Sequence, residues 1–252
     1  MQLHEMLIII LTGGILIGTP LYIYFRTQMI KSTGEFHKKR ILKITAINLV
    51  LMISVYLFFL AILLSILYQQ EGIISYTNLI VAGITLIVLG ICFYGNGIYI
   101  TSIVIEAFTP LDLKKSKSFN IQDNVIHLFH GPISHTLIYS GYIIIFFLFS
   151  IMEKNSNPTT SLLYTMVVCG IITGIMYTIA QSFNGTILYQ FITSLSIFVI
   201  VITRYGTNII SVFNYSLQTF FFFFLVSFLI TSSVYILYMR KRTKSIWYIR
   251  ST

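Results

Sequence analysis

Charged residues are scarce in this chain, at 9% of 252 residues, whereas soluble domains of this size carry about 25%. No stretch is long and polar enough to form a separate soluble domain, so we predict one membrane-embedded domain over residues 1–252. The formal net charge of +9 does not indicate nucleic acid as a partner, because the basic residues stand just outside apolar runs. We therefore expect a multi-pass protein of the lipid bilayer, in a cell membrane rather than an organelle.

Several familiar sequence motifs are also absent. The chain has no G-x-S-x-G, no H-E-x-x-H, no P-loop and no C-x-x-C. A retinal pigment needs a Schiff-base lysine inside the last span, and no lysine precedes Lys241 there, so retinal is excluded. The absence of arginine from the apolar runs excludes a voltage sensor. The two cysteines, Cys92 and Cys169, lie inside apolar runs and are expected to be buried rather than paired in a disulfide.

The chain is rich in apolar runs that are long enough to cross a bilayer, which takes about 20 mostly apolar residues in a helix. Such runs occupy residues 6–24, 44–67, 79–107, 133–152, 162–180, 187–203 and 220–239. The first run lacks the basic segment that precedes a cleaved signal, so we expect it to remain as a helix. The predicted fold is an all-α integral membrane protein, a bundle of seven transmembrane helices.

Basic residues mark one side of this predicted bundle. Of the 16 Lys and Arg residues, 14 fall in the loops after the first and third spans and in the C-terminal tail. With seven spans these three regions share one side, and the opposite loops hold only Lys154 and Arg204. By the positive-inside rule, we expect the N-terminus outside and the C-terminus in the cytosol.

Three of the five histidines stand in one short stretch before the fourth span. We predict a short interfacial helix from about Asn120 to His130, which Gly131-Pro132 ends as the chain turns into the span. In such a helix Asp123, His127 and His130 share one face, because they are spaced i, i+4 and i+7. The sequence therefore predicts a polar cluster at the cytosolic mouth of the third and fourth spans.

Polar side chains also recur at helical spacing inside the spans. One stripe runs along the third span toward its cytosolic end, and the fifth and sixth spans carry others. The members are Cys92, Asn96, Tyr99 and Glu106, then Cys169, Thr173, Tyr177 and Gln181, then Gln190 and Thr193. We predict that these stripes line one polar interior of the bundle. A carboxylate at the centre of a span costs about 2.5–3.5 kcal/mol on insertion scales, so Glu106 is expected to have a histidine or lysine partner.

Two kinds of chemistry suit the predicted cluster. As a metal site, His127, His130 and His135 would hold a divalent Zn, Fe or Cu ion. As an acid–base site, His135 would act with Glu106 and Asp123 on a lipid-soluble or membrane-surface substrate. In a purely structural alternative, the imidazoles contact lipid phosphates from an interfacial helix.

Two further features are interpreted as lipid contacts. His4 stands at the outer end of the first span and is expected at the membrane interface. The run Phe220–Phe224 is expected to be apolar bulk that faces lipid.

These observations leave three classes of function. The first is a membrane-embedded metal-dependent or acid–base enzyme with a cytosol-facing His/carboxylate cluster, and the clustered histidines favour it. The second is a non-catalytic helical subunit or scaffold that packs against other membrane subunits, and the short loops favour it. A transporter or sensor is the third class.

Overall fold

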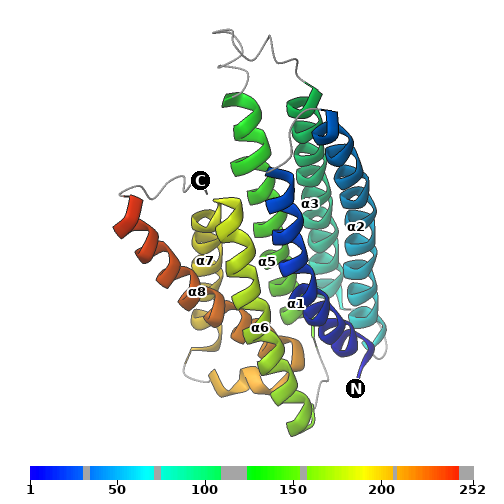
Figure 1. The fold of residues 1–252 in the computed structure, drawn as a ribbon. Helices are drawn as coiled ribbons and strands as arrows, with labels where there is room; N and C mark the ends of the chain where they lie inside the picture. Colours follow the sequence, from blue (N-terminus) through cyan, green and yellow to red (C-terminus); the bar gives the residue numbers. More distant parts are fainter. Residues whose placement is uncertain (31–34, 71–74, 109–123, 154–157, 207–208, 244–252) are drawn as a thin grey trace.

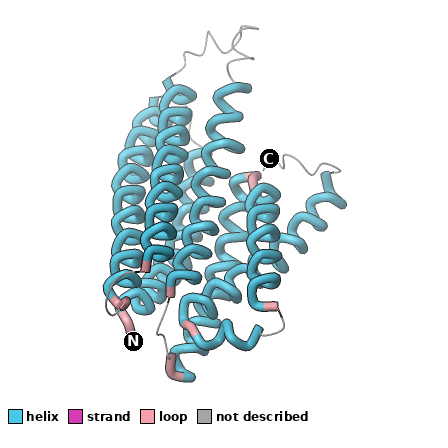
Figure 2. The backbone as a smooth tube through the Cα atoms, turned by 180° about the vertical axis from the view of Figure 1, so that it is seen from behind, coloured by secondary structure: helices cyan, strands magenta, loops and turns pink. Residues whose placement is uncertain are grey.

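The computed structural model describes residues 1–30, 35–70, 75–108, 124–153, 158–206 and 209–243 (Figure 1). Within these ranges the chain is helical apart from short turns, and no strand occurs (Figure 2). Seven of the helices in this part of the chain are long and apolar enough to cross a membrane. The all-α fold with seven candidate spans, predicted from the apolar runs, is therefore confirmed.

The long helices follow one another with short connections. Their bounds are α1 Leu3–Ile30, α2 Glu35–Tyr68, α3 Tyr76–Phe108, α5 Ser134–Met152, α6 Thr160–Asn184, α7 Ile187–Tyr205 and α8 Ser216–Thr243. Two short helices of other types accompany them, the π-helix η2 Phe129–Ile133 and the 3-10 helix η3 Ile209–Asn214. The fourth candidate span begins before α5 and covers Asn124–Met152.

The helices pack as two groups that share α5. The contacts join α1 to α2, α2 to α3 and α3 to α5 in one group, and α6 and α7 to α8 in the other. Helix α5 touches α3, α7 and α8, while α1 also packs on α6, so the groups are joined at two places. Figure 1 shows α8 crossing the neighbouring helices obliquely, and Figure 2 shows the same tilt from behind.

Helices α6 and α8 make the most extensive contact in the bundle, and two glycines of α6 allow it. A Cβ on Gly170 would lie 2.5 Å from the carbonyl oxygen of Phe220. A Cβ on Gly174 would meet the hydroxyl of Ser227 and the backbone of Phe224. The spacing Gly-x-x-x-Gly puts both glycines on one face of α6, which lets two membrane helices approach at backbone distance.

The prediction that Phe220–Phe224 faces lipid is wrong. Phe220, Phe221 and Phe224 are all buried in the core of the bundle. The ring centroid of Phe220 lies 5.5 Å from that of Phe146 in α5, and that of Phe224 lies 5.6 Å from that of Tyr177 in α6. These three rings are buried because α5 and α6 cover this part of α8, whereas Phe222 and Phe223 are half-buried.

The prediction that Gly131-Pro132 ends a separate helix is also wrong, because the helix continues through both residues as a π-turn. Proline lacks an N–H group and its ring clashes with the carbonyl four residues earlier, so a regular α-helix cannot pass through Pro132. The π-turn inserts one residue at this point, and the N–H of Ser134 bonds to the carbonyl of Phe129. The hydroxyl of Ser134 donates to the carbonyl of His130, whose usual α-helical donor, the N–H of Ser134, bonds to Phe129 instead. Residues 120–123, where the predicted interfacial helix begins, lie outside the described residues.

The predicted polar stripes of the spans do face the interior. Cys92, Cys169, Thr173, Gln181 and Gln190 are all buried, which also confirms the prediction for the two cysteines. Hydroxyl pairs join neighbouring helices at these positions. The pairs are Thr12 with Thr173 at 3.2 Å, Ser140 with Thr193 at 3.0 Å, and Thr178 with Thr231 at 2.6 Å. Such bonds stabilise packing between membrane helices, where apolar surface alone gives no preference for protein over lipid.

Candidate metal centre

Three side chains with metal-binding atoms meet at the end of the bundle that holds the N-terminus. His4, Glu5 and Glu153 each offer one donor atom, and these atoms all lie within 4.8 Å of one another. All three residues are buried, with exposed fractions of 0%, 2% and 4%. Two carboxylates and an imidazole that are removed from solvent in one place require a compensating positive charge.

The first turn of α1 supplies two of these residues. His4 and Glu5 are consecutive, and the acidic side chain lies where the amide dipoles of the helix favour a negative charge. The Glu5 carboxylate also accepts a hydrogen bond of 2.5 Å from the backbone N–H of Gln2. This bond holds one carboxylate oxygen against the start of α1.

Glu153 comes from the middle of the chain, directly after α5. Its carboxylate accepts four hydrogen bonds from the first turn of α8. The donors are the N–H and hydroxyl of Ser216, at 3.1 and 2.6 Å, and the N–H groups of Leu217 and Gln218, at 2.8 and 3.3 Å. Glu153 therefore caps α8, and the helix in turn fixes the position and orientation of the carboxylate.

The imidazole of His4 completes the arrangement. Its Nε2 lies 3.6 Å from Oε1 of Glu153, which is longer than a hydrogen bond. Neither ring nitrogen of His4 forms a hydrogen bond with the described part of the chain. Nitrogen and oxygen ligands of a tetrahedral zinc ion are about 3.3 Å apart, given bond lengths near 2.0–2.1 Å. The separation of these two atoms is thus close to what a shared metal ion requires.

A cavity of about 430 Å³ is lined by one of the three residues, Glu5. It lies between the first turns of α1 and α6, and Gln2, Glu5, Thr159, Ser161 and Thr165 are among its lining residues. Ligand sites of proteins usually have volumes of about 300–1,000 Å³. The cavity therefore gives a small molecule a route to the carboxylate of Glu5.

The histidines that were singled out from the sequence lie toward the opposite end of the bundle. The ring centroid of Tyr99 lies 4.9 Å from that of His130 and 5.2 Å from that of His135. The two imidazole centroids are 6.2 Å apart, and the ring of Tyr139 stacks on His135 at 5.6 Å. The structure thus brings two of the three predicted ligands together, around a tyrosine of the predicted stripe in α3.

Hydrogen bonds from four helices hold this second group. Gln190 of α7 donates to the carbonyl of His135 at 3.2 Å. Tyr22 of α1 donates to Asn184 at 2.9 Å, and Asn184 of α6 donates to the hydroxyl of Tyr139 in α5 at 3.4 Å. These polar groups are therefore linked across the bundle, and Gln190 is the residue among them that belongs to a predicted stripe.

The remaining predicted site residues are placed as follows. His127 lies in the helical turn before η2 and is half-buried, whereas Asp123 and the side chain of Glu106 lie outside the described residues. In the part of the chain that the structure describes, His4, Glu5 and Glu153 form the group that gathers three donor atoms at metal-binding distance. Metal binding by His127, His130 and His135, and acid–base chemistry by Glu106, Asp123 and His135, stay predictions.

The sequence analysis did not predict the group formed by His4, Glu5 and Glu153. The expectation that His4 is an interfacial residue is wrong, because its side chain is fully buried between α1 and the end of α5. A signal was present, since Glu5 and Glu153 are two of only seven acidic residues and both stand at predicted span ends on the same side. The contact itself depends on the tertiary packing of α1 against the end of α5, which no local pattern encodes.

Comparison with known proteins gives this chain no relatives: no protein-family model, curated protein or solved structure matches it. Conclusions about function therefore come from the chemistry of the two groups of residues.

Proposed function

We propose that this chain is a membrane-embedded metal-binding protein whose centre consists of His4, Glu5 and Glu153. The observation that carries the proposal is the burial of two carboxylates beside an imidazole whose nitrogens accept and donate no hydrogen bond within the described chain. A divalent cation would neutralise both carboxylates and occupy the free nitrogen of His4. One nitrogen and two oxygen donors suit Zn²⁺, Fe²⁺ or Mn²⁺.

The arrangement favours a reactive centre over a purely structural one. Structural zinc sites are closed by four protein ligands, whereas catalytic sites have three and leave one position for water or substrate. The three donors found here and the cavity beside Glu5 follow the second pattern. A metal ion bound in this way supplies Lewis-acid chemistry and lowers the pKa of a bound water.

The side of the membrane follows from the distribution of basic residues. The centre lies at the end of the bundle where α1 begins, opposite the ends of α1, α3 and α8, near which the basic regions occur in the sequence. With the basic regions in the cytosol, the proposed centre faces outward. This placement differs from the cytosol-facing site that the histidines before the fourth span suggest.

Elemental mass spectrometry of the purified protein tests the proposal. We expect about one equivalent of a transition metal in the wild type and a loss of it in His4→Ala and in Glu5→Gln. The matched control is His127→Ala/His130→Ala, which leaves the proposed centre intact. A metal that is lost only in the control places the site at the predicted cytosolic cluster and overturns the proposal.

The second candidate is a non-catalytic helical subunit of a larger membrane complex. It is favoured by the four hydrogen bonds that Glu153 accepts from α8, because capping alone is a structural reason to bury this carboxylate. Wild-type protein without metal, together with co-purifying membrane subunits, would support this candidate over the first.

A further inference from the structure

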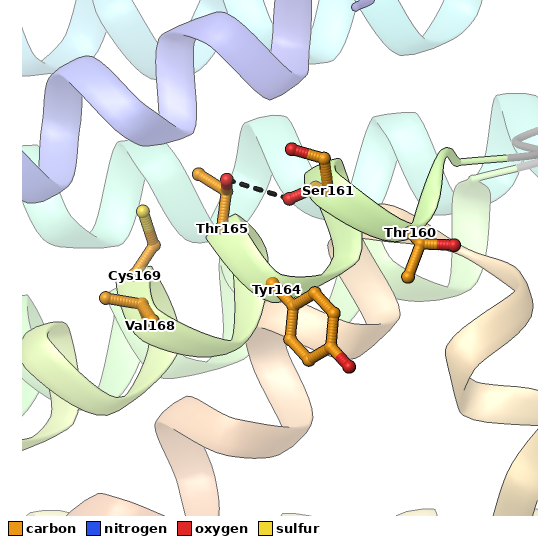
Figure 3. Close-up of a pocket in the computed structure, with 6 residues that line it drawn as sticks. All are labelled: Thr160, Ser161, Tyr164, Thr165, Val168 and Cys169. Atoms are coloured by element: carbon orange, nitrogen blue, oxygen red, sulfur yellow. Dashed lines mark hydrogen bonds between the residues drawn. The ribbon is translucent and has the colours of Figure 1, made fainter.

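A second hollow continues the cavity along the outer surface of α6. It has a volume of about 590 Å³ and is lined by Thr160, Ser161, Tyr164, Thr165, Val168 and Cys169 (Figure 3). Ser161 and Thr165 line both hollows, so the two meet at the first turns of α6. In Figure 3 the side chains of Thr165 and Cys169 point toward the neighbouring α1, and that of Tyr164 points to the other side.

The character of the lining changes along this path. At the end of the bundle it is formed by Gln2, Glu5 and the hydroxyl residues at the start of α6. Two turns further into the span it is formed by Val168 and Cys169, where Val168 is 54% exposed on the lipid-facing surface. A molecule that fills both hollows therefore has a polar head beside Glu5, at the end of the bundle, and an apolar chain along α6.

The charges of the lining select the kind of head group. Among the described residues that line the two hollows there is no lysine, arginine or histidine, and the charged groups are the carboxylate of Glu5 and the α-amino group of Met1, so this lining carries no net charge. Phosphate groups are bound by Arg and Lys side chains or by clusters of backbone N–H groups. Hydroxyl residues beside a carboxylate instead suit a head group that carries hydroxyl, ester or amide groups without net charge.

We propose that the two hollows bind one uncharged amphiphile, an alcohol, ester or amide with a single hydrocarbon chain, as the ligand of the metal centre. Its head group lies beside Glu5, and its chain follows α6 past Val168 toward the middle of the membrane. This assignment rests on the proposed metal centre, because it takes the amphiphile as the molecule that reaches the open position of the metal.

Native mass spectrometry from detergent micelles tests this binding with 1-oleoylglycerol as the probe. We expect the wild type to retain one molecule, and Val168→Trp to lower the occupancy by about tenfold because the indole fills the hollow. The matched control is Val234→Trp, since Val234 is similarly exposed, on α8, and lines neither hollow. Oleoyl lysophosphatidic acid and oleoyl lysophosphatidylcholine, with the same chain and charged heads, are measured alongside.

Three outcomes overturn the proposal: no retained 1-oleoylglycerol, equal retention in Val168→Trp, or retention of the charged lipids as strong as that of the uncharged one. The metal content of each sample separates this test from that of the proposed function. A wild type that holds metal without the amphiphile refutes the amphiphile alone. A wild type that binds the amphiphile at Val168 without holding metal refutes the metal centre instead.

Discussion

His4 Nε2 lies 3.6 Å from Glu153 Oε1, so the first turn of α1 meets the end of α5. The same carboxylate accepts hydrogen bonds from Ser216, the first residue of α8. One buried side chain thus ties together three helices that are far apart in the sequence. In the part of the chain that the structure describes, this junction is where buried charged side chains gather.

Removal of a bound metal should lower the stability of the wild type. A ligand present at 100 times its dissociation constant stabilises the folded state by about 2.7 kcal/mol, so a chelator removes a gain of that order. We expect EDTA to lower the thermal unfolding temperature of the wild type in detergent and to leave that of Glu5→Gln unchanged. Because metal ligands must be deprotonated, the difference should also shrink as the pH is lowered. Equal shifts in both proteins would contradict a metal held by Glu5.

Replacement of Glu153 should destabilise the bundle even where no metal is bound. Glu153→Gln substitutes an amide NH₂ for one of the oxygens that accept hydrogen bonds from the start of α8, which leaves buried N–H groups unsatisfied. Each such group costs about 1–3 kcal/mol, so we expect a large loss of thermal stability. Ser216→Ala removes only the hydroxyl donor and should cost about 1 kcal/mol. A Glu153→Gln variant as stable as Ser216→Ala would show that the cap is not important.

The contact between α6 and α8 should be sensitive to a single methyl group. Gly174→Ala places a Cβ against Ser227 and the backbone of Phe224, and overpacking of this kind costs about 1–3 kcal/mol. Gly90→Ala is the matched control, because no atom lies within 4 Å of the Cβ that it adds. Thermal unfolding in detergent should show a loss of stability for Gly174→Ala and none for Gly90→Ala. Similar values for the two variants would argue against the close approach.

The π-turn should set the position of His130. Pro132→Ala allows the π-turn to become regular α-helix. The preceding turn would then rotate by about 100° relative to α5. In a chain without Cys92 and Cys169, we expect Tyr99→Cys/His130→Cys to react with a short bifunctional thiol reagent. The reaction should be lost when Pro132→Ala is added. Tyr99→Cys/His135→Cys, on the other side of the turn, should react in both backgrounds, and loss of both reactions would indicate misfolding instead.

The orientation of the bundle can be measured with single cysteines in the same cysteine-free chain. Asn214 and Lys241 are both exposed, at opposite ends of the path of α8. If the basic regions are cytosolic, a membrane-impermeant maleimide labels Asn214→Cys in intact cells and labels Lys241→Cys only after permeabilisation. The reverse pattern would place the proposed metal centre in the cytosol.

The number and approximate positions of the helices could be predicted from the sequence, because a bilayer demands long apolar helices that satisfy their own backbone groups. The interior positions of Cys92, Thr173 and Gln190 followed from helical spacing for the same reason. These are local properties of each span. They need no knowledge of which helix lies beside which.

The incorrect predictions concern features that depend on contacts between residues far apart in the sequence or on the local hydrogen bonding of a turn. Phe220 is buried because α8 lies against α5, and nothing in five consecutive phenylalanines indicates this. Pro132 was expected to begin a helix, but a π-turn, in which the N–H of Ser134 bonds to the carbonyl of Phe129, carries the helix past the proline. The group of His4, Glu5 and Glu153 was missed because its three residues come from two helix ends, and His4 stood at a position typical of an interfacial histidine.

The cap that Glu153 provides has a consequence for biosynthesis. His4 precedes Glu153 in the chain and Ser216 follows Glu153 by 63 residues, so the junction is complete only after the start of α8 has been made. Until α8 arrives, a carboxylate without its hydrogen-bond donors stays at the end of α5. A chain that stops short of α8 therefore leaves this carboxylate without the four hydrogen bonds that α8 donates.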